Sequence, residues 1–296
     1  YAEVLVPLVG DANGMAGVRS LELDLAARYD RYSDVGSTWN PKIGVNWTLA
    51  TGLKARGAYG TSFRAPTIAQ IYGNTNNLFV QNYADPTCAC IRQGVARSGA
   101  NLNLTPEEAT TWSFGVDYEP GFLPRSKLSL TYFDIDYRNQ VVGYLSDLTV
   151  LQREAQFAGT GIITRNPSTA FIAQQLAETG FTGVLPNPVT LFVEGRNSNL
   201  GTTIARGVDF QASYRQPIAS GTLSMNLLAT HVIAFRSSTD ISTLFPTGID
   251  RAGQTGAAFG GPAGLPKWLV NLTMDYEIGG FGFNTNFRWV SKSHQN

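Results

Sequence analysis

Three basic residues spaced along one short stretch are the first side chains that could do chemistry. Lys54, Arg56 and Arg64 lie in LKARGAYGTSFRAP, residues 53–66, and all three occupy even-numbered positions. Because successive side chains of a β-strand point to opposite faces of the sheet, a strand here would place the three on one face. Such a face could steer an anionic ligand, or its charges could pair with those of neighbouring strands.

The two cysteines, Cys88 and Cys90, stand one residue apart in DPTCACIRQG. Thiols this close in sequence can form a local disulfide or hold a metal ion as a pair. A metal site needs further ligands, and no histidine or third thiol stands nearby, so the metal pair is the less favoured alternative. Neither alternative supplies a disulfide framework across the domain.

Catalytic patterns are missing from the sequence. Its two histidines, His231 and His294, have no nucleophile motif or suitably spaced carboxylate beside them. The glycine-rich turns GTGI, GFTG and FGGPAG have neither a P-loop lysine nor a dinucleotide fingerprint. No zinc, calcium or haem signature is present either. We therefore expect no catalytic residues, no metal site and no cofactor, and predict that the protein is not an enzyme.

The composition favours an all-β membrane or globular protein. The 296 residues have a formal net charge of zero, with 43% hydrophobic and 15% charged residues, which excludes disorder and gives no reason to expect nucleic acid as a partner. Glycine and aromatic residues are abundant, at 31 Gly, 16 Phe, 12 Tyr and 5 Trp, as is typical of turns and pleated surfaces. No apolar stretch reaches the roughly 20 residues of a membrane-spanning helix, and the first residues lack the pattern of a signal peptide.

Strict alternation of apolar and polar residues recurs along the chain and predicts about ten strands. Together with the opening segment, the strands are expected at 20–30, 38–49, 53–64, 111–119, 127–137, 204–215, 222–235, 267–278 and 281–290. The alternation changes phase once, near Tyr132 and Phe133, where we expect a bulge.

The links between the predicted strands alternate in length. Short links are expected at 10–17, 50–52, 119–126, 216–221 and 278–280, and long ones at 31–38, 65–106, 139–199 and 236–266. In an antiparallel sheet, every short link then lies at one end and every long link at the other. That is the layout of an outer-membrane barrel, with short periplasmic turns and long extracellular loops.

A soluble β-sandwich is the main alternative, and three features argue against it. The predicted strands have about 10 residues or more, whereas soluble strands usually have about 5 to 6. All five tryptophans share the parity of the apolar face, and most lie near strand ends, as in the aromatic girdles of a barrel. Charged and amide side chains recur on the opposite parity, which suits a hydrated lumen.

The motifs and their order resemble the β-barrel of TonB-dependent outer-membrane receptors. The resemblance is carried by LELDLAARYDRYSDVGSTWNPKIGVNWTLATGLKARGAYGTSFRAPTIAQIYG, by NLNLTPEEATTWSFGVDYEPGFLPRSKLSLTYFDIDYRNQV with its proline–glutamate pair, by ARGVDFQASYR and by LPKWLVNLTMDYE. It implies a 22-stranded barrel filled by an N-terminal plug, which imports a ferric siderophore, vitamin B12 or a carbohydrate with energy from the TonB complex. About ten strands and no plug would make residues 1–296 a partial barrel domain, truncated at both ends, with two open sheet edges.

The resemblance gives the charged and aromatic residues expected roles. Arg28, Lys54 and Arg56 would face the lumen that the plug fills. Arg64 would face plug carboxylates or an anionic ligand, although an ion pair with a neighbouring strand is the simpler expectation for it. Tyr72, Phe79 and Tyr83 in the loop 65–106 are candidates for ligand contact, unless that loop folds back on itself.

A helix is also expected within the longest loop, in PSTAFIAQQLAETG, with Pro167 early and Gly180 as its C-cap. We predict a TonB-dependent receptor in the outer membrane, with membrane lipid, a small-molecule ligand and the TonB complex as partners. A passive porin is the alternative function among transport proteins. A soluble β-sandwich binding protein is the third candidate.

Overall fold

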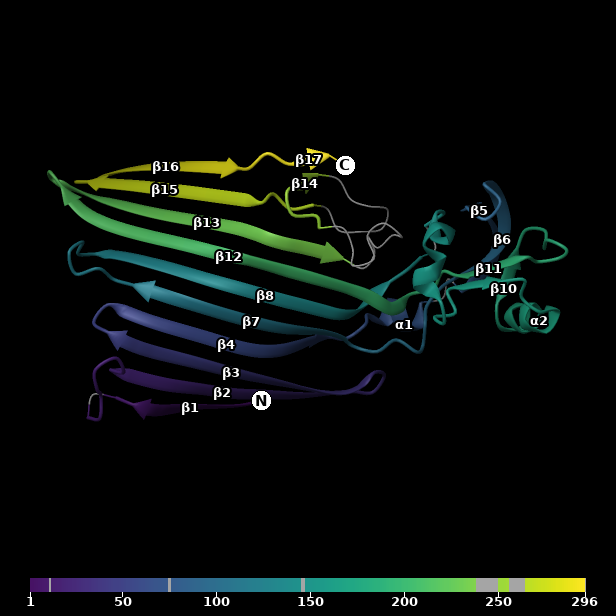
Figure 1. Ribbon diagram of the computed structural model, residues 1–296, viewed down its shortest axis with the longest axis horizontal. Helices are drawn as coiled ribbons and strands as arrows, with labels where there is room; N and C mark the ends of the chain where they lie inside the picture. Colours follow the sequence, from purple (N-terminus) through teal and green to yellow (C-terminus); the bar gives the residue numbers. More distant parts are fainter. Residues whose placement is uncertain (11, 74–75, 145–146, 238–249, 256–263, 296) are drawn as a thin grey trace.

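The ten predicted strands form one antiparallel sheet in the computed structural model, which describes residues 1–10, 12–73, 76–144, 147–237, 250–255 and 264–295. In Figure 1 the strands of this sheet run side by side from the N-terminal strand in purple to the C-terminal strands in yellow. In sheet order the strands are β1 (Ala2–Val9), β2 (Ser20–Tyr32), β3 (Gly36–Ala50), β4 (Leu53–Arg64), β7 (Glu107–Tyr118), β8 (Ser126–Val142), β12 (Ser198–Ile218), β13 (Gly221–Ser237), β15 (Trp268–Ile278) and β16 (Phe281–Val290).

Most of the links follow the prediction. Short links such as Ala50 to Leu53 and Ile218 to Gly221 lie at one end of the sheet, and the long loops after β4 and β8 lie at the other (Figure 1). The long link predicted at 31–38 is wrong, because β2 runs to Tyr32, β3 begins at Gly36 and a tight turn joins them. Within the described residues β1 pairs only with β2 and β16 only with β15, so the sheet is open and two edges are unpaired. The ten strands lie in one sheet instead of two facing sheets, which overturns the sandwich alternative.

The two faces of the sheet differ in chemistry as the alternation predicts. One face, called the outward face here, carries the aromatic residues, and cross-strand pairs such as Tyr29 with Trp39 and Tyr59 with Trp112 bring their rings within 6.3 and 4.5 Å. The other, inward face carries ion pairs, among them Lys42 with Asp24 at 3.2 Å. Large apolar side chains are exposed on the outward face.

The bulge expected near Tyr132 and Phe133 is absent, and that prediction is wrong. β8 pairs with β7 in unbroken register from Arg138 opposite Glu108 to Leu128 opposite Tyr118. The side chains of β8 still alternate between the two faces of the sheet. Toward the loop end of the strand, however, charged side chains take the outward positions that apolar side chains hold elsewhere on β8. There Asp134 and Asp136 share the outward face with Leu130, because these outward positions lie beyond the apolar belt.

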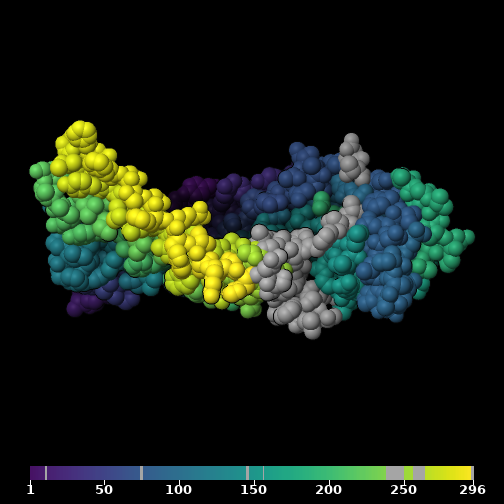
Figure 2. Space-filling model, turned by 90° about the horizontal axis from the view of Figure 1, so that it is seen from above, coloured from purple at the N-terminus to yellow at the C-terminus, as the bar shows by residue number. Residues whose placement is uncertain are grey.

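The two longest loops fold together into a second structure at the loop end, called the outer-loop module here. Its five-stranded sheet has the order β10 (Gly180–Thr182), β5 (Asn77–Asp85), β6 (Cys90–Ser98), β11 (Leu191–Glu194) and β9 (Ile163–Arg165). Figure 2 shows residues of the first loop, in blue, packed beside those of the second, in teal, at the end away from the short turns. Sequence analysis predicted none of these five strands.

Three helical segments accompany the loops: α1 (Ile68–Tyr72), the 3-10 segment η1 (Val150–Phe157) and α2 (Thr169–Glu178). The predicted helix within residues 167–180 is therefore confirmed. Ser168 caps its first turn and Thr179 is its C-cap, so Gly180 begins β10 instead of ending the helix.

Two short strands, β14 (Gln254–Thr255) and β17 (His294–Gln295), pair in parallel. Part of the predicted loop 236–266 lies outside the described residues. Among the described helices none is long and apolar enough to cross a membrane.

Candidate functional site: the outer-loop module and the inward face

Two hydrophobic cores hold the outer-loop module together, one on each face of its small sheet. Neighbouring residues of β6 enter different cores, Val95 one and Ala96 the other, as the alternation of a strand requires. α2 covers the first face through Ile172, and η1 covers the second through Val150 and Leu151. The module is therefore a helix–sheet–helix sandwich with its own buried interior, not a set of independent loops.

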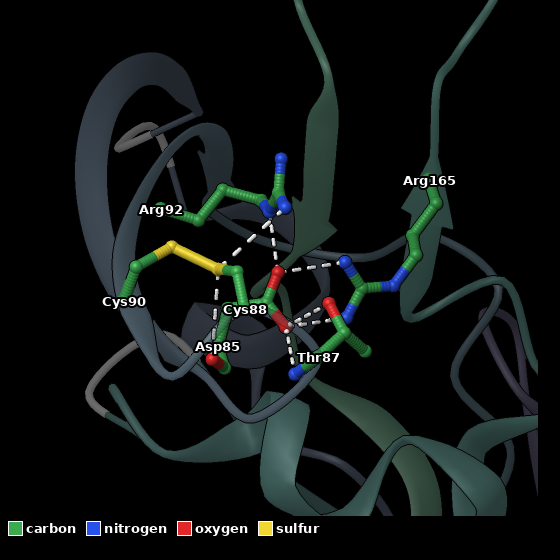
Figure 3. The surroundings of a disulfide bond; sticks show 6 residues. All are labelled: Asp85, Thr87, Cys88, Cys90, Arg92 and Arg165. Atoms are coloured by element: carbon green, nitrogen blue, oxygen red, sulfur yellow. Dashed lines mark hydrogen bonds and ion pairs between the residues drawn. A yellow bond between two sulfur atoms is a disulfide. The ribbon is translucent and has the colours of Figure 1, made fainter.

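Asp85 is the centre of an ionic cluster that joins the two loops (Figure 3). Its carboxylate is fully buried and accepts hydrogen bonds from both terminal nitrogens of Arg165, at 2.8 and 3.0 Å. The backbone N–H and hydroxyl of Thr87 donate to it at 3.0 and 2.8 Å, and Arg92 donates through Nε. Arg165 also binds Glu154 at 2.8 Å. These donors, Arg165 first, hold the pKa of the Asp85 carboxyl well below its usual range.

The cysteine pair lies in the turn that follows Asp85. Cys88 and Cys90 form a disulfide in the hairpin between β5 and β6, beside the guanidinium of Arg92 (Figure 3). The disulfide alternative is thus confirmed, and these sulfurs do not form a metal pair. Within the described ranges no group of three or more His, Cys, Asp or Glu side chains is placed to hold a metal ion.

A buried cation, Arg97, ties β6 to α2. Arg97 is 5% exposed and donates to Gln175 at 2.6 Å and to Glu178 at 3.0 Å. At the base of the module, Asn199 on β12 donates to the carbonyl oxygens of Thr105 and Asn139, at 2.8 and 2.7 Å. These bonds hold both loops against the end of the barrel strands.

The aromatic candidates divide into buried and exposed residues. Tyr83 is fully buried in the core beneath η1, and Phe79 packs against the same core. Tyr83 therefore cannot contact a ligand in this arrangement, and Phe79 is partly buried, as expected if the loop folds back on itself. Tyr72, at the end of α1, is 53% exposed and remains the aromatic candidate for ligand contact.

The basic candidates all lie on the inward face or at its rim. Arg56 binds Asp117 at 3.2 Å and donates to the hydroxyls of Ser129 and Thr131, which bridges three strands. Arg28 pairs with Asp30 at 2.8 Å, while Lys54 forms no salt bridge with any described residue. Arg64 pairs with Glu107 at 3.3 Å, the ion pair between neighbouring strands that the sequence favoured. Whether any of these residues faces a plug remains a prediction.

Three residues of this region were missed by sequence analysis: Asp85, Arg165 and Glu107. Glu107 is fully buried, accepts a hydrogen bond from the backbone N–H of Val141 at 3.0 Å and another from the hydroxyl of Tyr137. The only signal for it was the proline–glutamate pair that opens β7. Asp85 and Arg165 are 80 positions apart, and no local pattern connects them.

A long-stranded antiparallel sheet with an aromatic outward face, a charged inward face and long loops at one end defines the class of outer-membrane β-barrel proteins. A family model described as "TonB dependent receptor-like, beta-barrel" matches residues 6–296. The chain therefore belongs to this family of TonB-dependent receptors, and it is an outer-membrane protein of a Gram-negative bacterium.

Individual relatives share the fold at low identity. The probable TonB-dependent siderophore receptor PirA of Acinetobacter baumannii is 23% identical over 145 residues, which are 49% of this chain and 18% of that protein. The crystal structure of siderophore receptor PirA from the same species aligns with a TM-score of 0.55 at 17% identity, over 92% of this chain and 32% of that one. A mutant of the ferric enterobactin receptor PfeA from Pseudomonas aeruginosa aligns with a TM-score of 0.57 at 14% identity, over 94% and 30% of the two chains. This chain thus spans about a third of the length of the solved relatives.

Proposed function

We propose that this chain is part of the barrel of a TonB-dependent transporter that imports a ferric siderophore into the periplasm. The observation that carries the proposal is the match of the family model to residues 6–296, and relatives named as siderophore receptors support the ligand class. Vitamin B12 and carbohydrate remain the competing ligand classes within the family.

The geometry is consistent with gated uptake of a ligand from outside. The ionic cluster around Asp85 and the two cores make the outer-loop module one body at the loop end of the sheet. Asn199 fixes its base to β8 and β12. A ligand held beneath such a module would meet the exposed side chains of Tyr72 and Arg64. We propose these two residues as ligand contacts, and Arg28, Lys54 and Arg56 as contacts of a plug that fills the lumen.

The proposal is tested by deleting the complete gene and measuring uptake of a radiolabelled ferric siderophore in iron-starved cells. We expect the deletion to abolish uptake of one siderophore, a plasmid copy to restore it, and a strain without TonB to lack it even with the plasmid. Uptake of labelled vitamin B12 and maltodextrin in the same strains distinguishes the ligand classes. Uptake that persists without TonB would contradict the transporter and favour the passive porin.

A further inference from the structure

The hairpin between β5 and β6 carries the disulfide of Cys88 and Cys90 at its tip, on the surface of the outer-loop module. The proposed import gives this bond no role. We propose that the bond is redox-active and exchanges with a low-molecular-weight thiol from the surroundings, which attacks Cys90 and releases Cys88 as a thiolate beside Arg92. The proposal does not depend on which ligand the receptor imports.

The disulfide contributes little to holding the module together. It closes a ring around a single residue, Ala89, and the stabilisation that a disulfide gives by constraining the unfolded chain decreases as the closed loop shortens. The strands on either side of it are already paired in unbroken antiparallel register. Two buried cores and the pair of Asp85 with Arg165 hold the loops around it. Opening the bond should therefore leave the module folded.

The bond is open to a thiol in solution. Both cysteines are exposed, as are Thr87 and Ala89 beside them, and Ile91 is 68% exposed. Disulfides that hold a fold together resist reduction by glutathione, whereas exposed or strained ones are the labile, regulatory or catalytic ones. The exposure of this pair places it in the second group.

The backbone inside the ring is strained. Ala89 has a φ of 49°, in the left-handed region that a residue with a Cβ rarely adopts. The disulfide joins the residues on both sides of Ala89, so this backbone can leave the left-handed region more readily once the bond opens. That release favours the dithiol form.

Arg92 gives the two sulfurs different roles. Its Nη2 lies 3.8 Å from Sγ of Cys88, and the carbonyl oxygen of Asp85 lies 3.7 Å from the same sulfur (Figure 3). A guanidinium stabilises the negative charge of a thiolate beside it, and the sulfur that carries this charge better is the better leaving group. The Asp85 carboxylate neutralises Arg92 only in part, because both of its oxygens also bind Arg165. Cys88 is therefore the leaving sulfur, and Cys90 is the one attacked.

The exchange has two steps. In the first, a small thiolate forms an S–S bond with Sγ of Cys90, the bond between the two cysteines breaks, and its electron pair stays on Cys88. In the second, another small thiolate attacks the sulfur of the small thiol in the mixed disulfide, and Cys90 leaves as a thiolate. The protons of the two small thiols end on the two cysteines. The small thiol is oxidised to its own disulfide, and the disulfide of the protein is reduced to a dithiol.

The experiment follows reduction of the receptor expressed from its complete gene and purified in detergent. Glutathione is the probe, mixed with its disulfide at the redox balance of the cytosol. Free thiols are trapped with iodoacetamide, and peptide mass spectrometry distinguishes Cys88 from Cys90. We expect the bond to open, the mixed disulfide to carry glutathione on Cys90, and proteolysis of the module to stay unchanged. A bond that remains closed, glutathione on Cys88, or a module that unfolds on reduction would each overturn the proposal.

A first pair of variants tests the leaving sulfur. Arg92→Gln should slow the first step about fivefold, because the charge on Cys88 loses its guanidinium. Arg92 also binds Asp85, so Arg165→Gln is the matched control: it disturbs the same carboxylate, and no contact joins Arg165 to either described sulfur. Arg165→Gln should keep the rate of the wild type. Equal slowing in both variants would overturn the role of Arg92.

A second pair tests the strained backbone. Ala89→Gly should lower the equilibrium ratio of dithiol to disulfide about threefold, because glycine adopts the left-handed region without a Cβ penalty. Ala158→Gly is the matched control, since Ala158 is also exposed on the outer-loop module but has an ordinary φ of −56°. It should leave the ratio unchanged. The ratio of the wild type in Ala89→Gly would show that the bond holds no backbone strain and would overturn that part of the proposal.

Discussion

Arg165 in the second long loop binds both carboxylate oxygens of Asp85 in the first, at 2.8 and 3.0 Å. This bidentate pair connects two segments that leave the barrel from different strands, β4 and β8. Because Asp85 is fully buried while Arg165 is 25% exposed, the pair lies at the edge of the module's interior, where it is only partly screened by water. The outer-loop module therefore depends on a small number of polar contacts as well as on its two cores.

Replacing Asp85 with asparagine should loosen the module. The variant keeps the size of the side chain but leaves Arg165 and Arg92 without their shared carboxylate, at a cost of about 2–4 kcal/mol. Urea-dependent proteolysis of the two loops in detergent should show earlier cleavage, with the barrel strands unaffected. Asp34→Asn, in an exposed turn, is the control. Cleavage unchanged from the wild type would contradict the structural role of the pair.

The same carboxylate should make the module sensitive to acid. Its pKa is lowered on folding, so the unfolded loops take up a proton first, near the ordinary aspartate value of about 3.9. The contribution of the ionised Asp85 carboxylate to the stability of the module is fully present above that value. It is lost as the pH falls toward the pKa that Asp85 has in the folded module. The loops of the wild type should become more sensitive to an acid-active protease below about pH 4, and Asp85→Asn should remove much of that change.

Tyr83 should have the opposite dependence on pH. Burial raises the pKa of its hydroxyl, and that hydroxyl has no hydrogen-bond partner within the described residues. The contribution of the neutral Tyr83 side chain to the stability of the module is therefore fully present below the pKa of an unfolded tyrosine, about 10. It is lost as the pH rises above that value. Tyr83→Phe should leave stability at neutral pH unchanged or slightly higher and weaken the alkaline loss. A marked loss of stability at neutral pH would show that the hydroxyl is bonded after all.

Glu107 and Arg64 should respond very differently to truncation, although they form one ion pair. Glu107→Ala removes a buried carboxylate that Arg64, Tyr137 and the backbone of Val141 contact, and should cost about 2–4 kcal/mol. Arg64→Ala should cost at most about 1 kcal/mol, because the arginine is largely exposed. Thermal unfolding of the complete receptor in detergent measures both. Equal effects would mean that the ion pair, and not the burial of Glu107, stabilises the rim.

Tyr72 provides the test of ligand contact. If its exposed ring contacts the imported ligand, Tyr72→Ala should weaken binding about fivefold to tenfold without changing thermal stability. Phe79→Ala should instead lower the stability of the module, because Phe79 packs against a core. Binding is measured by quenching of intrinsic fluorescence by the ligand that the uptake experiment identifies. Unchanged binding in Tyr72→Ala would remove this residue from the proposed contacts.

The strands of the barrel could be predicted from the sequence because their signal is local. A strand with one face toward lipid and the other toward water alternates with a period of two, and that period appears within each segment without knowledge of its neighbours. The outward position of Trp112, the inward position of Arg56 and the ends of the short turns all follow from it. The inversion on β8 misled the prediction near Tyr132, because the alternation persists while the surroundings of the strand change from lipid to water.

The outer-loop module could not be predicted, because its contacts join residues that are distant in sequence. β5 pairs with β10 about a hundred positions later, so neither the short strands nor the burial of Tyr83 has a local signature. In the sequence Asp85 resembles any aspartate at a turn, and its structural role follows only from its contact with Arg165 in the folded protein. The sequence by itself determined the barrel strands, their two faces and the family. Only the tertiary structure decided which loop residues are buried, because burial there depends on two loops folding around each other.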